Sequence, residues 1–209
     1  MLETTPADYE TAAPKETMDA VANRLRERNV EAVIVATGAD AKAAIFDRLP
    51  EGAEVHSSKS RTLEDIGVFK ELMESGRYDF IRTRTYAMDR QTQAREIRKL
   101  GAAPDYMLGS AQALTEAGQI VVASASGLQI GPYAMGAEKL ILVVGSQKIV
   151  PDLDAAFGRI RDHVQPYEDA RLREQYGIGT TLAQVLIMER VFGPAGRITV
   201  ILVREPVGV

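Results

Sequence analysis

EKLILVVGSQKIVP (residues 138–151) is the stretch that decides the fold. Its apolar run, Leu140–Val144, is short and continuous, as expected of a strand that is covered on both faces. The strand is predicted to end at Gly145, and a helix is predicted to begin at Pro151. A strand, a turn of small residues and a helix start form the unit from which α/β sheets build ligand sites. The stretch therefore predicts an α/β protein.

Two further units of the same kind precede this stretch. In the first, a strand over Glu31–Ala36 leads into a helix over Ala41–Leu49, for which Asp40 is the predicted N-cap. In the second, a strand over Ala53–His56 leads into a helix that begins at Leu63. Alternating strands and helices predict a three-layer α/β/α sandwich with a mostly parallel sheet.

Antiparallel hairpins are predicted to add strands to this sheet. One covers residues 110–124, and the other covers residues 184–204 around Gly193–Gly196. In the second hairpin, the apolar strand Ile198–Val203 is expected to lie at an edge, where it would pair with a partner and make the protein a homo-oligomer. Between the hairpins, helices are predicted from Pro151 to Val164 and over Glu168–Gln175.

Length and composition restrict the class of protein. The 209 residues suffice for one α/β domain over 15–209, preceded by a flexible arm over 1–14. The net charge of −4 argues against a nucleic-acid partner. No apolar run is long enough to span a membrane, and no signal peptide is recognisable, so a cytoplasmic location is expected. The chain has no cysteine and two histidines, so no metal site is predicted.

Four turns are the predicted ligand-binding loops, because the carboxyl ends of parallel strands collect ligands. The turn 57–62 is the strongest, since its hydroxyls and two cations suit a phosphate or a carboxylate. The alternative is a solvated loop in which Thr62 and Asp65 form a capping box. For the other turns, the alternative is an ordinary connection between elements. The predicted ligand-binding residues are Thr37, Gly38, Ser57, Ser58, Lys59, Ser60, Thr62, Ser124, Ser126, Gly127, Gly145 and Lys148.

Glu116 is the predicted catalytic residue, with a role as general base. It is the carboxylate inside the central motif, between two strand-like runs. Its alternative role is structural, because Thr-Glu-Ala-Gly is a favourable turn sequence.

Several segments together resemble the LUD domain family, which is named for lactate-utilisation proteins. The resemblance lies in order along nearly the whole chain, in SRTLEDIG (60–67), GSAQALTEAGQIVV (109–122), ILVVGSQKIVPDLDAAFGRI (141–160) and GRITVILVREPVG (196–208). It implies a fold similar to glucosamine-phosphate deaminases, ribose-phosphate isomerases and CoA transferases. Family members often carry cysteines in the region that is Tyr176–Leu186 here, and this chain has none there.

The resemblance also implies a function linked to the oxidation of lactate. One hypothesis is an accessory protein that binds a small anionic ligand, with electron carriers on partner proteins that hold iron–sulfur clusters. A second is a stand-alone enzyme acting on a sugar phosphate, a CoA ester or a folate-like compound. A third is an interaction module, whose pocket would be filled by side chains. The cofactor is left open.

Overall fold

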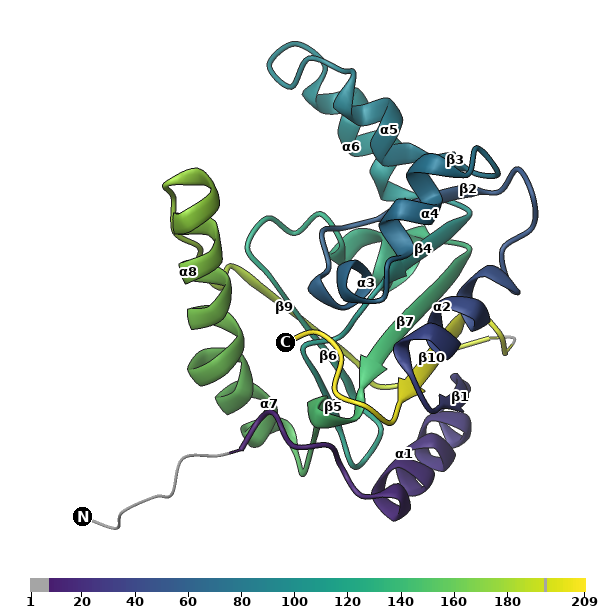
Figure 1. Ribbon diagram of the computed structural model, residues 1–209, viewed down its shortest axis with the longest axis vertical. Helices are drawn as coiled ribbons and strands as arrows, with labels where there is room; N and C mark the ends of the chain where they lie inside the picture. Colours follow the sequence, from purple (N-terminus) through teal and green to yellow (C-terminus); the bar gives the residue numbers. More distant parts are fainter. Residues whose placement is uncertain (1–7, 194) are drawn as a thin grey trace.

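Six parallel strands form the main sheet of the molecule. The structure is a computed structural model that describes residues 8–193 and 195–209 (Figure 1). The strands lie in the order β1-β10-β7-β4-β2-β3, and every neighbouring pair is parallel. Their bounds are β1 Glu31–Val35, β2 Glu54–Ser57, β3 Asp79–Phe80, β4 Tyr106–Gly109, β7 Lys139–Gly145 and β10 Ile198–Val203.

The last strand lies inside the main sheet, so the predicted hairpin over 184–204 is wrong. β10 pairs in parallel with β1 on one side and β7 on the other, and all six of its residues are buried. Its predicted pairing partner, β9 (Gln184–Met188), belongs to a different sheet. The prediction that Ile198–Val203 forms an edge is therefore also wrong. A strand covered on both faces is uniformly apolar, which indicates burial but not which strands lie beside it.

A second sheet of four strands contains the hairpin predicted over 110–124. Its order is β8-β5-β6-β9, with β5 and β6 antiparallel and β5 and β8 parallel. The bounds are β5 Ala113–Thr115, β6 Ile120–Ser124 and β8 Ile149–Val150. Because β8 directly follows β7, the chain passes from the main sheet to the second sheet beside Lys148.

The helices cover the two sheets. They are α1 Lys15–Glu27, α2 Gly38–Phe46, α3 Arg61–Asp65, α4 Val68–Glu74, α5 Ile81–Tyr86, α6 Ala94–Ala102, α7 Leu153–Arg159 and α8 Gln165–Tyr176. A π-helical turn over Pro132–Gly136 precedes β7. None of the helices in the described residues is long and apolar enough to cross a membrane.

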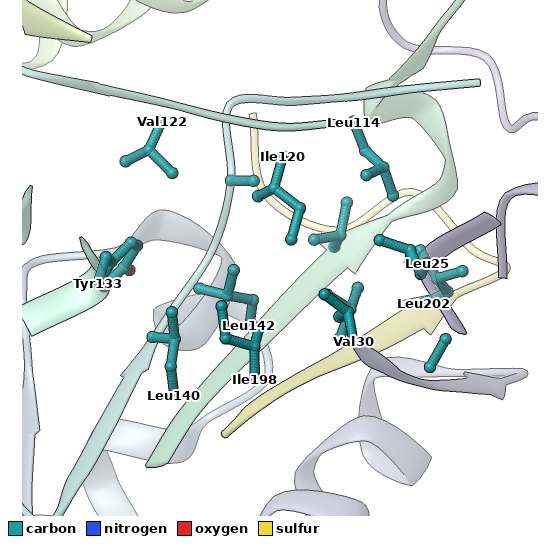
Figure 2. Packing of buried hydrophobic residues seen from close by; sticks show 14 of the residues in the cluster. Leu25, Val30, Leu114, Ile120, Val122, Tyr133, Leu140, Leu142, Ile198 and Leu202 are labelled. Carbon is teal, nitrogen blue, oxygen red and sulfur yellow. The ribbon is translucent and has the colours of Figure 1, made fainter. Parts of the chain in front are cut away.

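Side chains alternate between the two faces of the main sheet, as the period of a strand requires. Ile141 and Val143 of β7 pack with α2, α3 and α4. Leu140 and Leu142 point the other way, into a core shared with α1 and the second sheet (Figure 2). A smaller core joins the far face of the second sheet to α7. The predicted three-layer α/β/α sandwich, with a mostly parallel sheet and added antiparallel strands, is confirmed.

Two predicted helix starts are corrected by the local hydrogen bonds. Thr37, not Asp40, is the N-cap of α2: its hydroxyl accepts from the backbone N–H of Asp40, whose carboxylate accepts from the Thr37 N–H in return. Ser60, not Thr62, caps α3, because its side chain accepts from the N–H of Leu63. In both cases the helix begins before the position that the sequence predicts. At α2 the reason is that Asp40 is the reciprocal acid of the capping box, and such an acid resembles a cap in sequence.

The two helices predicted after Pro151 join into one continuous helical segment. Asp152 caps α7, and a π-helical turn over Ile160–Val164 links α7 to α8. No residue of α8 is fully buried, and the helix stands away from the main sheet at its carboxyl edge (Figure 1).

Part of the predicted N-terminal arm contacts this helical segment. Residues 1–7 lie outside the described residues. The ring of Tyr9 lies 5.6 Å from that of His163 and 5.9 Å from the guanidinium carbon of Arg159. The single domain over 15–209 stays a prediction.

Candidate functional site

A small pocket lies where the carboxyl ends of the central strands meet. Its volume is about 60 Å³. The loops after β2, β4 and β7 contribute Ser58–Thr62, Ser110–Gln112 and Lys148. The remaining lining residues are Gln129, Tyr133, Val164, Tyr167, Glu168 and Val209. The position agrees with the general rule that open parallel sheets bind ligands at this edge.

Lys148 is the central residue of the pocket. It follows β7 on a short 3-10 turn, and only 2 % of it is exposed. Its Nζ donates to Thr62 Oγ1 at 2.8 Å and to Ser110 Oγ at 3.2 Å. Both partners are neutral hydroxyls, so the ammonium is buried without a neutralising charge from either of them.

Asp65 is the acidic residue whose charge acts on Lys148, but its carboxylate does not form an ion pair with Lys148. The Asp65 carboxylate instead accepts from Arg61 Nε at 2.8 Å. Among the residues that the structure describes, no carboxylate forms an ion pair with Lys148. Burial and, to a smaller extent, the charge of Arg159 lower the pKa of Lys148 to about 7, and the charge of Asp65 opposes the change.

Arg159 is a second buried cation behind the pocket. It comes from the last residue of α7 and is fully buried. Its Nη1 donates to the carbonyl oxygen of Gln112 at 2.6 Å, while Nε and Nη2 have no hydrogen-bond partner among the described residues. Burial lowers the pKa of Arg159 to about 10. Two incompletely paired cations therefore give this region a strong positive potential.

Tyr133 closes the pocket on the side of the π-helical turn. Its hydroxyl lies 3.5 Å from the carbonyl oxygen of Ser110 and is hydrogen-bonded to Ser58. Burial raises the pKa of this phenol above its ordinary value, so it remains protonated. Gly109 leaves the space for the ring, because a Cβ at that position would overlap the Tyr133 hydroxyl.

The end of the chain and α8 form the rim. The side-chain amide of Gln147 donates to the carbonyl oxygens of Val207 and Gly208, each at 3.1 Å. On the opposite side, Lys59 Nζ donates to Gln175 of α8 at 2.8 Å. The rim carboxylate, Glu168, is already paired with Arg171 at 2.7 Å and so does not neutralise Lys148.

Five of the predicted ligand-binding residues come together here. They are Ser58, Lys59, Ser60, Thr62 and Lys148. Ser57 is buried next to them but does not line the pocket, and its hydroxyl donates to the carbonyl oxygen of Ser58 at 2.7 Å.

Thr37 and Gly38 do not line the pocket. They follow β1 at one edge of the sheet, and β10 lies between them and β7, the nearest strand of the pocket. Thr37 is part of the cap of α2, and the Gly38 N–H donates to the Glu205 carboxylate.

The predicted loop 124–127 also lies outside the pocket lining. The Ser124 hydroxyl donates to Gln129 Oε1 at 3.0 Å and accepts from the Gly127 N–H at 2.8 Å, so it positions Gln129, which does line the pocket. Ser126 makes a local contact with the N–H of Leu128. Gly145 gives room to the C-terminal segment, since a Cβ there would lie 2.7 Å from the backbone nitrogen of Val207.

Glu116 is exposed at the turn between β5 and β6 and does not line the pocket. Its backbone N–H donates to the carbonyl oxygen of Val150 at 2.8 Å, which extends the pairing of β5 with β8. Its role as a general base stays a prediction. No group of three or more histidine, aspartate or glutamate side chains in the described part of the chain is arranged to hold a metal ion.

Sequence reasoning missed Ser110, Gln129, Tyr133 and Arg159. Two of them carried a usable signal. Ser110 follows the strand end Leu108–Gly109, just as Ser146 follows β7. Arg159 lies next to Ile160 and three residues after Ala156, on the apolar side of its helix, where a charged residue is unexpected.

Comparison with known proteins places the chain in a family. The model of the LUD domain matches residues 18–203. The chain is similar to a DUF162 family protein from Deinococcus radiodurans, known from a crystal structure, with 16 % identity and a TM-score of 0.56. That match covers 92 % of this chain and 99 % of the other, and it shows a shared fold. Comparison with curated proteins gives no match. Since the LUD model spans most of its length, the chain belongs to the LUD domain family.

Proposed function

We propose that this protein binds a small organic or phosphate-bearing anion in the Lys148 pocket, as an accessory component of lactate or related organic-acid utilisation. The family supports the general metabolic area. One observation carries the proposal of an anion: a fully buried ammonium held by two neutral hydroxyls. A buried charge of this kind is unfavourable unless an opposite charge compensates it.

The shape of the pocket supports a small ligand, or the charged end of a larger one. A volume of about 60 Å³ is enough for a carboxylate or phosphate group. Serine and threonine hydroxyls around it offer hydrogen bonds to anionic oxygens, and Lys59 and Arg61 lie at its rim.

The proposal includes the setting expected from the sequence. It comprises a cytoplasmic location and no nucleic-acid partner. It also comprises partner proteins of lactate oxidation that carry iron–sulfur clusters, because this chain has no cysteine thiolate to bind such a cluster. It also retains the kinship with the deaminase, isomerase and CoA-transferase folds.

Calorimetric titration tests the proposal. Phosphate, L-lactate, pyruvate, a sugar phosphate and CoA are titrated into the wild type, Lys148→Met and the matched control Lys70→Met, which alters an exposed lysine. We expect one class of anion to bind the wild type and the control equally, and Lys148→Met at least about tenfold more weakly. Equal binding to all three proteins, or no binding by any of these anions, would contradict the proposal.

The alternative is a stand-alone enzyme on a sugar phosphate, a CoA ester or a folate-like compound. A specific observation favours it: the hydroxyls of Thr62 and Ser110 both contact the buried amine, as in sites that transfer protons. Turnover of any of these substrates by the isolated chain, lost in Lys148→Met but kept in Glu116→Gln, would support an enzyme centred on the pocket. Loss in Glu116→Gln alone would support the general base predicted from the sequence.

A further inference from the structure

The surroundings of Lys148 suit a nucleophilic amine as well as an anion-binding ammonium. A lysine becomes nucleophilic when it is desolvated or lies near another cation, because both favour the neutral amine. Lys148 meets the two conditions: it is buried, and the charge of Arg159 acts on it. Its pKa of about 7 means that both protonation states are populated at neutral pH.

Two hydroxyls stand ready to move protons beside this amine. Thr62 Oγ1 and Ser110 Oγ lie 2.8 and 3.2 Å from Lys148 Nζ and 3.2 Å from each other. Ser110 also contacts the carbonyl oxygen of Ala111 at 3.3 Å. The three polar atoms form a closed triangle, and all three residues line the pocket. A carbonyl compound bound in the pocket would therefore meet an amine and two proton carriers.

We propose that Lys148 Nζ forms an imine with the carbonyl carbon of a small oxo acid bound in this pocket. The inference rests on the proposed function, because the acid group of the substrate is the anion of that site. When Lys148 is the neutral amine, the hydroxyls of the pocket and the rim cations Lys59 and Arg61 are the donors for this acid group. The carbonyl group is an added requirement, which separates oxo acids from hydroxy acids and from inorganic phosphate.

The step balances without an oxidant or a reductant. The lone pair of the neutral amine attacks the carbonyl carbon, a C–N bond forms as the C=O π bond breaks, and one nitrogen proton passes to the carbonyl oxygen through the hydroxyls of Ser110 and Thr62. The resulting carbinolamine then loses its hydroxyl group, together with the last nitrogen proton, as water. The net change is amine plus carbonyl to imine plus water, and it is reversible.

The charged groups around Lys148 set the pH range in which the imine forms. Arg159 from α7 disfavours the ammonium, and Asp65 from α3 favours it. The third charged group is His163, from the π-helical turn over Ile160–Val164. It also interacts with Lys148 through charge, and its pKa is lowered mainly by burial. Imine formation should thus increase with pH through neutrality, whereas binding of a simple anion to the ammonium should decrease.

Reductive trapping tests the proposal on the full chain. The protein is incubated with pyruvate and sodium borohydride, and intact mass and peptide mapping identify the modified lysines. At pH 7 we expect one reduced pyruvate adduct on Lys148, formed at least about tenfold faster than on any exposed lysine, because exposed lysines remain protonated at neutral pH. L-lactate, which has no carbonyl group, should give no adduct and should slow trapping by pyruvate.

Variants separate the chemistry from binding and from folding. Lys148→Met should lose the adduct, and Lys70→Met should keep it. Ser110→Ala should slow trapping at least about tenfold at pyruvate concentrations that saturate each protein, so that a change in affinity does not contribute. Pyruvate binding by calorimetry without an adduct at Lys148 would overturn the imine and leave the proposed anion site intact. Absence of both pyruvate binding and the adduct would overturn the imine and the proposed anion site together.

Discussion

Replacing Lys148 by methionine should stabilise the protein at pH 6, although it removes two hydrogen bonds. The side chain is buried, and its pKa falls from 10.5 in the unfolded chain to about 7 in the folded protein. A change of that size corresponds to about 5 kcal/mol of unfavourable free energy for the charged form in the folded state. Methionine has a similar length and carries no charge. After subtracting about 1–2 kcal/mol for the lost hydrogen bonds, we expect a gain of about 3–4 kcal/mol.

The pH dependence of this gain identifies its cause. Because the folded-state pKa is depressed, the unfolded chain binds more protons than the folded protein between pH 7 and 10.5, so Lys148 makes the wild type more stable as pH rises through that window. The penalty is complete below pH 7. Between pH 6 and pH 9 the wild type should recover about 3 kcal/mol relative to Lys148→Met, in which this titration is absent.

Chemical unfolding at the two pH values measures the effect. Guanidinium titrations followed by circular dichroism give the free energy of unfolding of the wild type, Lys148→Met and the control Lys70→Met. The control should stay within about 0.5 kcal/mol of wild type at both pH values. If the difference between Lys148→Met and wild type is the same at pH 6 and pH 9, Lys148 is not a desolvated charge, and the reasoning that leads to the anion site fails with it.

Substitutions at three other positions test how the fold builds the site. Thr37→Ala should lower the free energy of unfolding by about 1 kcal/mol through loss of the α2 cap, and Thr37→Ser should stay close to wild type. Both variants should bind the anion with wild-type affinity. An altered affinity would mean that this turn binds the ligand. Gly109→Ala should destabilise by about 1–3 kcal/mol in thermal unfolding, because its methyl group displaces Tyr133, and a neutral result would contradict the tight contact. Leu202→Ala should lower stability by about 2–5 kcal/mol in urea unfolding, as in the centre of a core, whereas an edge strand would tolerate it.

The amino-acid sequence by itself determined the class of fold and the position of the central strand. Leu140–Val144 is apolar without interruption, and the need to cover both faces of such a strand is a local property of its composition. The hairpin over 110–124 is likewise local, since its two strands are neighbours in the chain. The same holds for Lys148 and Ser58–Thr62, which follow strand ends and so had to lie at the carboxyl edge of the sheet.

Only the tertiary structure decided which strands are neighbours and which side chains converge. Gly193 and Gly196 suggest a hairpin, but β10 lies between β1 and β7, because its apolar side chains can be covered on both faces only inside the main sheet. That strand order places β10 between the strand that carries Thr37 and β7, the nearest strand of the pocket. It also brings Ser110 to Lys148 from 38 residues away, and it buries Arg159 behind them. Local patterns in a sequence report whether a residue is buried or turns the chain; the contacts that give the site its chemistry depend on the order in which the strands assemble.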